Sequence, residues 1–115
     1  MGIQFTNNAY STLASNINNS TTTIVLETGT GSRFPSLAAG DHFYVTIADN
    51  SGNSEIVKVT ARSTDTLTVV RAQDSTTAKS FVATNRVELR PIAQAMRDVR
   101  DEAESTALAL AIALG

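Results

Sequence analysis

The central part of the sequence alternates between apolar and polar residues with a period of two. Phe43, Val45 and Ile47 share one face of an extended chain, and Tyr44, Thr46 and Ala48 share the other. This alternation is typical of a β-strand with one buried face. The turn-forming run Asp49–Asn53 predicts a hairpin to a second strand over Glu55–Arg62, in which Val57, Val59 and Ala61 share a face.

Weaker strand signals lie on both sides of this hairpin. Ser63–Asp65 predicts a turn into a third strand of the meander with Leu67 and Val69 on one face, and Arg86–Arg90 predicts a last short strand. Between them, residues 71–85 are expected to form a loop in which Phe81 and Val82 fold back as anchors.

Upstream of the meander, we expect a hairpin and a loop. The strands of the hairpin are predicted around Leu13 and over Thr22–Glu27, and Thr28–Gly40 is predicted to be a surface loop anchored by Phe34 and Leu37. The sequence therefore predicts a mainly β fold: a small antiparallel barrel or sandwich of about five to six strands with a C-terminal α-helix.

The period changes at Pro91, which suits the first turn of a helix. Apolar residues then recur at steps of three and four to the terminus, and the last turns are apolar nearly all round. We divide the chain into a β-rich attachment domain, residues 1–90, and a helix for oligomerisation or docking, residues 91–115. The helix is expected to remain uncovered by the sheet. The predicted interface comprises Ile92, Met96, Val99, Ala103, Ala107, Leu108, Leu110, Ile112 and Leu114.

Composition narrows the classes of partner. Only 5% of the 115 residues are aromatic, so we expect a thin core that gains stability from oligomerisation. The net charge of −2 disfavours nucleic acid, which requires clustered Lys and Arg. The apolar run Ala107–Leu114 is too short for a membrane helix, and no secretory signal is visible. The chain contains no cysteine, so it has neither disulfides nor thiolate metal ligands.

Few residues suggest chemistry. Asp41 and His42 are neighbours on a strand and so point to opposite faces, which prevents a direct pair. Asp98 with Asp101 or Glu102 is predicted to lie on a solvated helical face beside Arg97 and Arg100. The glycine-containing loop Thr28–Ser32 lacks the Lys that a phosphate-binding loop requires. Four arginines that could bind an acidic ligand are scattered over separate elements: Arg33, Arg62, Arg71 and Arg86. Two tyrosines could stack on a sugar, Tyr10 and Tyr44. No catalytic, cofactor-binding or metal-binding residue is predicted, and no cofactor.

Several runs resemble a module of tailed-bacteriophage virion proteins, which often opens a tail-fibre protein. The resemblance covers about Thr6 to Arg90 and is densest over Glu55–Ala78, including S-E-I-V-K-V-T-A-R and R-A-Q-D-S-T-T-A. Such modules often carry glycine where this chain has Ala72 and Ser75, so the turn there must adopt another conformation or tolerate strain. The resemblance implies a β-rich attachment domain in a virion, with no catalytic residues.

These observations predict a non-enzymatic virion structural protein, assembled in the host cytoplasm. No shaft or tip follows the helix, so we expect a short tail-fibre base or adaptor on the tail or collar. It is expected to associate with other virion proteins and with itself, and a trimer is our guess. The alternative is a capsid decoration protein. The copy number per particle would distinguish a capsid location from a tail or collar location. A carbohydrate- or cell-surface-binding module is an alternative of another class.

Overall fold

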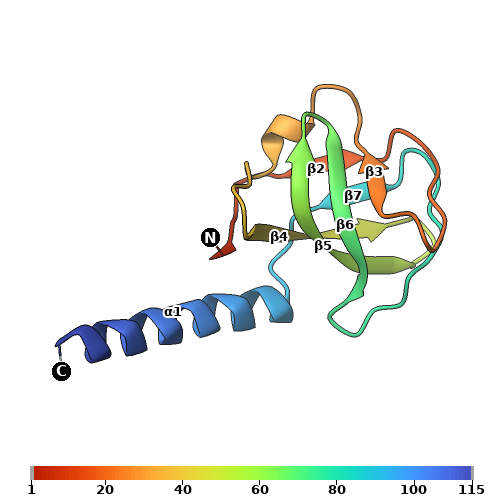
Figure 1. The fold of residues 1–115 in the computed structure, drawn as a ribbon. Coiled ribbons are helices and arrows are strands. Elements are labelled where there is room, and N and C mark those ends of the chain that lie inside the picture. Colours follow the sequence, from red (N-terminus) through yellow and green to blue (C-terminus); the bar gives the residue numbers. More distant parts are fainter. Residues whose placement is uncertain (1, 115) are drawn as a thin grey trace.

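The computed structural model of the protein describes the backbone of residues 2–114 and the side chains of residues 2–105. Within these limits the chain is mainly β, with a curled antiparallel sheet and one long helix at the C-terminal end, as predicted (Figure 1). Its elements are β1 (Gly2–Ile3), β2 (Tyr10–Thr12), β3 (Thr23–Val25), the 3-10 helix η1 (Gly31–Arg33), β4 (Asp41–Ala48), β5 (Ser54–Ser63), β6 (Thr66–Gln73), β7 (Arg86–Glu88) and α1 (Ala93–Leu114).

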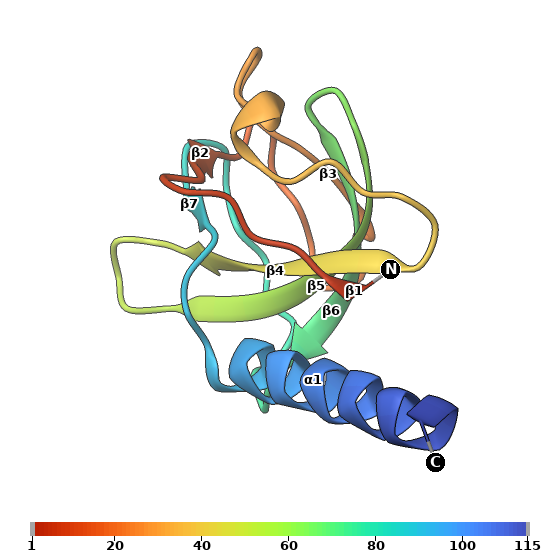
Figure 2. The same ribbon diagram turned by 90° about the vertical axis from the view of Figure 1, so that its left-hand side faces the viewer.

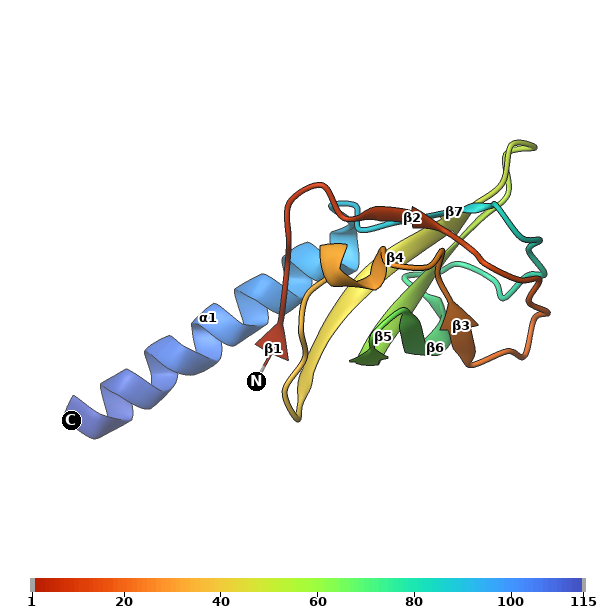
Figure 3. The ribbon, with the colours of Figure 1, turned by 90° about the horizontal axis from the view of Figure 1, so that it is seen from above.

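The sheet has the order β2-β7-β4-β5-β6-β3, and the short β1 adds in parallel to the start of β4. The meander β4-β5-β6 is therefore confirmed, with Phe43 opposite Val59 and Val45 opposite Val57. At the far ends, an isolated bridge joins Leu13, next to β2, with Leu26, next to β3. The sheet thus curls into a half-barrel whose two ends meet (Figure 3).

The core fills the concave side of this sheet. Phe43, Ile47, Val57 and Val59 are buried on the face that the alternation predicted, and the ring of Phe34 stacks on that of Phe43 with centroids 5.9 Å apart. Leu37 packs against the same cluster from the loop before β4, as expected. Core burial of this kind supplies most of the free energy that opposes chain entropy.

Four details of the sequence-based fold are wrong. The N-terminal strands do not form a simple hairpin, because β2 pairs with β7 and β3 with β6, and only one bridge links them directly. Ala61 is exposed, because the register shifts between Val59 and Ala61. Phe81 is buried, but Val82 is 57% exposed. The second face of β4 is also buried, including Tyr44, Thr46 and Ala48.

The end of β6 and the turn after it tolerate backbone strain where glycine was expected. Ala72 has φ 56° and Ser75 has φ 65°, which is the left-handed region that L-residues disfavour. Ala72 lies in a bulge, because Ile56 pairs with Gln73 whereas Lys58 pairs with Val70. The extra residue re-aims the chain, and the Ala72 N–H donates to the Glu55 carboxylate at 3.0 Å.

We expect Ala72→Gly to stabilise the protein by about 0.5–1 kcal/mol. Relief of left-handed strain, roughly 1–2 kcal/mol, exceeds the roughly 0.5–1 kcal/mol that the extra freedom of glycine costs. Urea unfolding measures the difference. Ala78→Gly is the matched control, because Ala78 does not have a positive φ and glycine there is expected to destabilise. An equal loss of stability in both variants would contradict the strain.

Candidate functional site

The candidate site is α1 and the part of the sheet on which it lies. The 22-residue helix has a length of about 33 Å, and it extends well beyond the sheet (Figure 1). Figure 2 shows α1 below the sheet, where its first half lies against β1 and is joined to β4 through Tyr44. The helix begins just after Pro91, and the Asp74 carboxylate accepts the backbone N–H of Gln94 at 3.1 Å. That contact satisfies one of the free donors at the helix start.

A polar cluster joins the helix to the sheet. The Asp98 cluster comprises Asp98, Gln94, His42 and Tyr44. The Tyr44 hydroxyl donates to Asp98 Oδ2 at 2.7 Å, His42 Nε2 donates to the same oxygen at 2.8 Å, and Gln94 Nε2 donates to Asp98 Oδ1 at 2.8 Å. Because His42 and Tyr44 are two residues apart on β4, they share the face beneath the helix, with their rings edge to face at 5.4 Å.

The cluster keeps Asp98 ionised. Burial raises the pKa of this carboxyl, but the hydrogen bonds from Tyr44, Gln94 and His42 outweigh it, so the pKa lies below its usual value of 3.8. Burial and the adjacent Asp98 charge raise the pKa of the Tyr44 hydroxyl, which therefore remains a donor. His42 thus pairs with Asp98 across 56 residues of sequence.

Two more contacts extend this polar side of the helix. Arg97 donates to Asp74 at 2.8 Å, and Glu102 Oε2 accepts the backbone N–H of Ile3 at 2.9 Å. The prediction that Asp98 and Glu102 face solvent is therefore wrong, because both side chains accept hydrogen bonds from residues distant in sequence. Arg100 does remain exposed, with only long ion pairs to Asp101 at 3.3 Å and Glu104 at 3.9 Å. The expectation that the helix is left uncovered is thus wrong for its first half.

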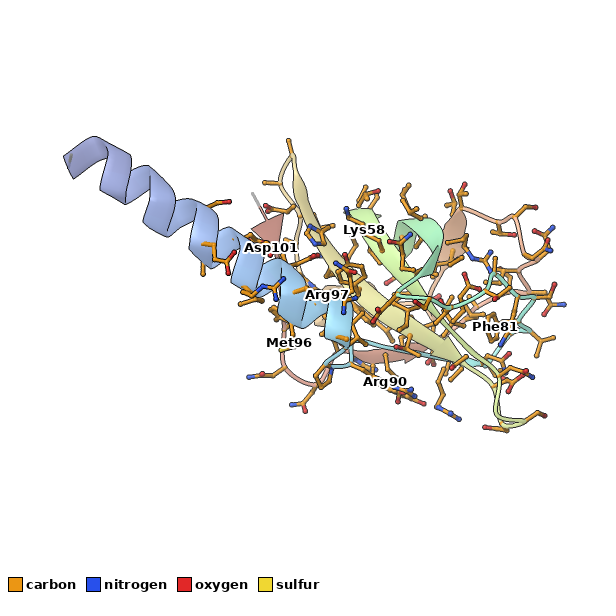
Figure 4. All side chains as sticks on the ribbon, turned by 90° about the horizontal axis from the view of Figure 1, so that it is seen from below. Lys58, Phe81, Arg90, Met96, Arg97 and Asp101 are labelled. Carbon is orange, nitrogen blue, oxygen red and sulfur yellow. The ribbon has the colours of Figure 1, made fainter. Side chains whose placement is uncertain are left out.

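The opposite side of the helix is apolar and exposed. Met96 is 52% exposed and Val99 43%, and Phe5 beside them is 46% exposed. Together with Leu89 and Pro91 they line the apolar groove, about 440 Å³ in volume. Figure 4 shows Met96 and Asp101 on different sides of α1. Of the predicted interface, Ile92 is half-buried and Ala103 is exposed; the side chains of Ala107, Leu108, Leu110, Ile112 and Leu114 lie outside the described residues.

The four arginines considered for an acidic ligand do not converge. Arg33 donates to the Tyr10 carbonyl, Arg62 to the Pro35 carbonyl and Arg86 to the Asn50 side chain. Each of them therefore fixes a local loop.

Arg71 forms a buried ion pair with Glu55, which sequence reasoning missed. The Glu55 side chain has no exposure, and its carboxylate receives two bonds from Arg71, at 2.7 and 2.8 Å. Arg71 also donates to the carbonyls of Asn18, Thr21 and Lys79. The sequence did contain a signal for its burial, because Glu55 lies at alternate positions with Val57 and Val59 and therefore shares their buried face of β5. The pair organises the loops around the end of the half-barrel.

The two tyrosines do not make a common stacking platform. Tyr44 is 5% exposed and lies under α1, whereas Tyr10 is 44% exposed on β2. The Thr28–Ser32 loop does not bind through free N–H groups either, because Gly29 and Gly31 both donate to the Asp65 carboxylate. These groups are therefore used within the fold.

Among the described residues, no three His, Asp or Glu side chains gather as a metal site would require. In the part of the chain that the structure describes, α1 is not apolar over a length that could cross a bilayer. Comparison of the sequence with models of known protein families, and with curated proteins, finds no match.

Proposed function

We propose that the chain is a non-enzymatic structural protein of a tailed-bacteriophage virion, a short tail-fibre base or adaptor that associates with itself through α1. One observation carries the proposal: α1 uses its polar side on its own sheet and leaves Met96 and Val99 exposed beside Phe5. Exposed apolar side chains gathered in a groove are typical of an interaction surface.

The arrangement of side chains supports a structural role over a catalytic one. In the Asp98 cluster, the carboxylate already accepts three hydrogen bonds. These bonds use Asp98 to join α1 to β4. The β-domain supplies a rigid platform, and the motifs that resemble virion proteins lie in that platform, over Glu55–Ala78.

The sequence supports a second copy as the partner of the helix. The 3–4 spacing of Ile92, Met96, Val99 and Ala103 continues in sequence through Ala107, Leu110 and Leu114. A continuous line of this kind along one helix matches the same line on a copy. The β-domains would then remain free to contact other proteins of the tail or collar.

Met96→Lys should weaken self-association at least tenfold. Burying a methionine side chain is worth about 1.5–3 kcal/mol, and about 1.4 kcal/mol corresponds to a factor of ten in the dissociation constant. Sedimentation velocity over a concentration series gives the constant. Val70→Lys is the matched control, because Val70 is 47% exposed on β6, away from the groove, and it should change the constant little.

Removal of residues 107–115 should have the same effect and leave the β-domain folded. A parent chain that sediments as a monomer at all concentrations would contradict self-association.

Quantitative mass spectrometry of purified particles tests the virion assignment. Absence of the chain from the particles would overturn that assignment.

A further inference from the structure

The contact between α1 and its own sheet is almost wholly polar. Within the described side chains of α1, Ala95 alone is fully buried. The polar contacts are hydrogen bonds from or to Gln94, Arg97, Asp98 and Glu102, whereas Met96 and Val99 only border the apolar groove. Alanine offers little apolar area, so burial contributes little to docking. The position of α1 therefore depends on directional bonds.

Asp98 is at the centre of these bonds. It is the residue of α1 that binds two side chains of β4, and it fixes Gln94 one turn earlier as well. His42 and Tyr44 are on a strand with neighbours on both sides, so their positions are rigid. Bonds from two fixed donors to one oxygen define the rotation of the helix about its own axis, because the carboxylate reaches both at one angle only.

The rotation of the helix decides which side chains are exposed. Successive residues of an α-helix are about 100° apart, so Met96 lies about 160° from Asp98, and Val99 about 100° from it. With Asp98 on β4, Met96 must point away from the sheet, as its 52% exposure shows. The hydrophobic effect alone would favour the reverse orientation, with Met96 and Val99 against the sheet.

We propose that Asp98 is a positioning residue that holds α1 in the rotation at which its apolar side is offered to a second copy of the chain. This inference rests on the proposed self-association through α1, and it adds the residue that controls it. Loss of the Asp98 contacts frees the helix to rotate or detach, and the apolar side is then no longer held in one place.

The position of α1 can be measured in the monomer, independently of association. Because the chain contains no cysteine, spin labels attach only at introduced sites. Arg100→Cys on the helix and Thr68→Cys on β6 are both exposed positions. We expect one narrow distance distribution in the parent and a broad or shifted one in Asp98→Ala. Asp101→Ala is the matched control, because among the described residues Asp101 accepts hydrogen bonds only from the exposed Arg100, at 3.3 and 3.4 Å, and it should keep the narrow distribution.

Two conservative variants separate positioning from a general effect on folding. Asp98→Asn keeps an acceptor for Tyr44 and His42, so it should restore the narrow distribution. Tyr44→Phe retains the ring and removes one donor, and it should broaden the distribution less than Asp98→Ala does. A narrow, parent-like distribution in Asp98→Ala would overturn the proposal.

Sedimentation of the unlabelled variants tests the consequence for association. Asp98→Ala should raise the dissociation constant at least tenfold, and Asp98→Asn and Asp101→Ala less than twofold. If the parent does not associate, the proposed function fails, while the monomer distances still report on Asp98. If Asp98→Ala moves the helix but associates like the parent, the role of Asp98 in association is overturned.

Discussion

Replacing Arg71 by methionine should destabilise the protein by about 3–5 kcal/mol, because it leaves the fully buried Glu55 carboxylate without its counter-charge. The variant also loses the bonds that Arg71 donates to the carbonyls of Asn18, Thr21 and Lys79. Urea unfolding followed by circular dichroism measures the change.

The matched control for this prediction is Arg100→Met. Arg100 is 62% exposed in its pairs with Asp101 and Glu104, and exposed pairs of this kind contribute about 0–1 kcal/mol. Arg71→Met should therefore cost several times more than the control. Equal, small changes in both variants would show that the Glu55 pair does not organise the fold.

The pH dependence gives a second readout of the same pair. Burial raises the pKa of Glu55, but Arg71 and the N–H groups of Lys79 and Ala72 outweigh it, so the folded-state pKa lies below 4.5. A carboxyl group whose pKa is lowered by folding stabilises the protein at pH values above its pKa in the unfolded state. That stabilisation is lost as the pH falls through its pKa in the folded state. Without Arg71, only the N–H groups of Lys79 and Ala72 oppose burial, so the pKa of Glu55 rises relative to that in the parent protein. The penalty of Arg71→Met should therefore shrink as the pH is lowered from 7 toward 4.

Gly31→Ala should cost about 3 kcal/mol for a different reason. A Cβ at this position would lie 1.9 Å from the Thr64 carbonyl oxygen and 2.9 Å from the Asp65 Cα. Both are backbone atoms of the turn between β5 and β6, so no side-chain rotation relieves the clash. The same turn is held to the loop by Asp65, which accepts the N–H groups of Gly29 and Gly31 at 3.0 and 2.8 Å.

Gly52→Ala is the matched control for this clash. Gly52 has φ 89° with open space around it, so alanine meets only backbone strain, roughly 1–2 kcal/mol. Thermal or urea unfolding of both variants compares the two costs. If Gly31→Ala is no more destabilised than Gly52→Ala, the loop does not approach the turn as closely as described.

The sequence predicted the parts of the fold in which one physical signal dominates. Phe43, Val45 and Ile47 alternate because one face of β4 contacts the core, and the turn Asp49–Asn53 fixes the register with β5. The helix was predicted for the same reason, from its period after Pro91. Local patterns of this kind need no knowledge of distant residues.

The polar interactions were not predictable in this way, because each joins residues far apart in the chain. His42 and Asp98 are 56 positions apart, and nothing local shows that α1 lies on β4. Glu55 had the parity of a buried residue, but only its position beside Arg71 explains why a charge is tolerated there. Met96 and Val99, which were predicted to lie in an oligomer interface, are exposed in the monomer, whereas the docked side of the helix was missed.

The bridge between Leu13 and Leu26 protects the edges of the sheet against pairing with other molecules. Open sheet edges recruit strands from other molecules and lead to aggregation. Here the chain segments after β2 and β3 meet through that bridge, which consists of the backbone bonds from Ala14 to Val25 and from Glu27 to Thr12. Many copies can therefore accumulate at high concentration while strand exchange between them is disfavoured.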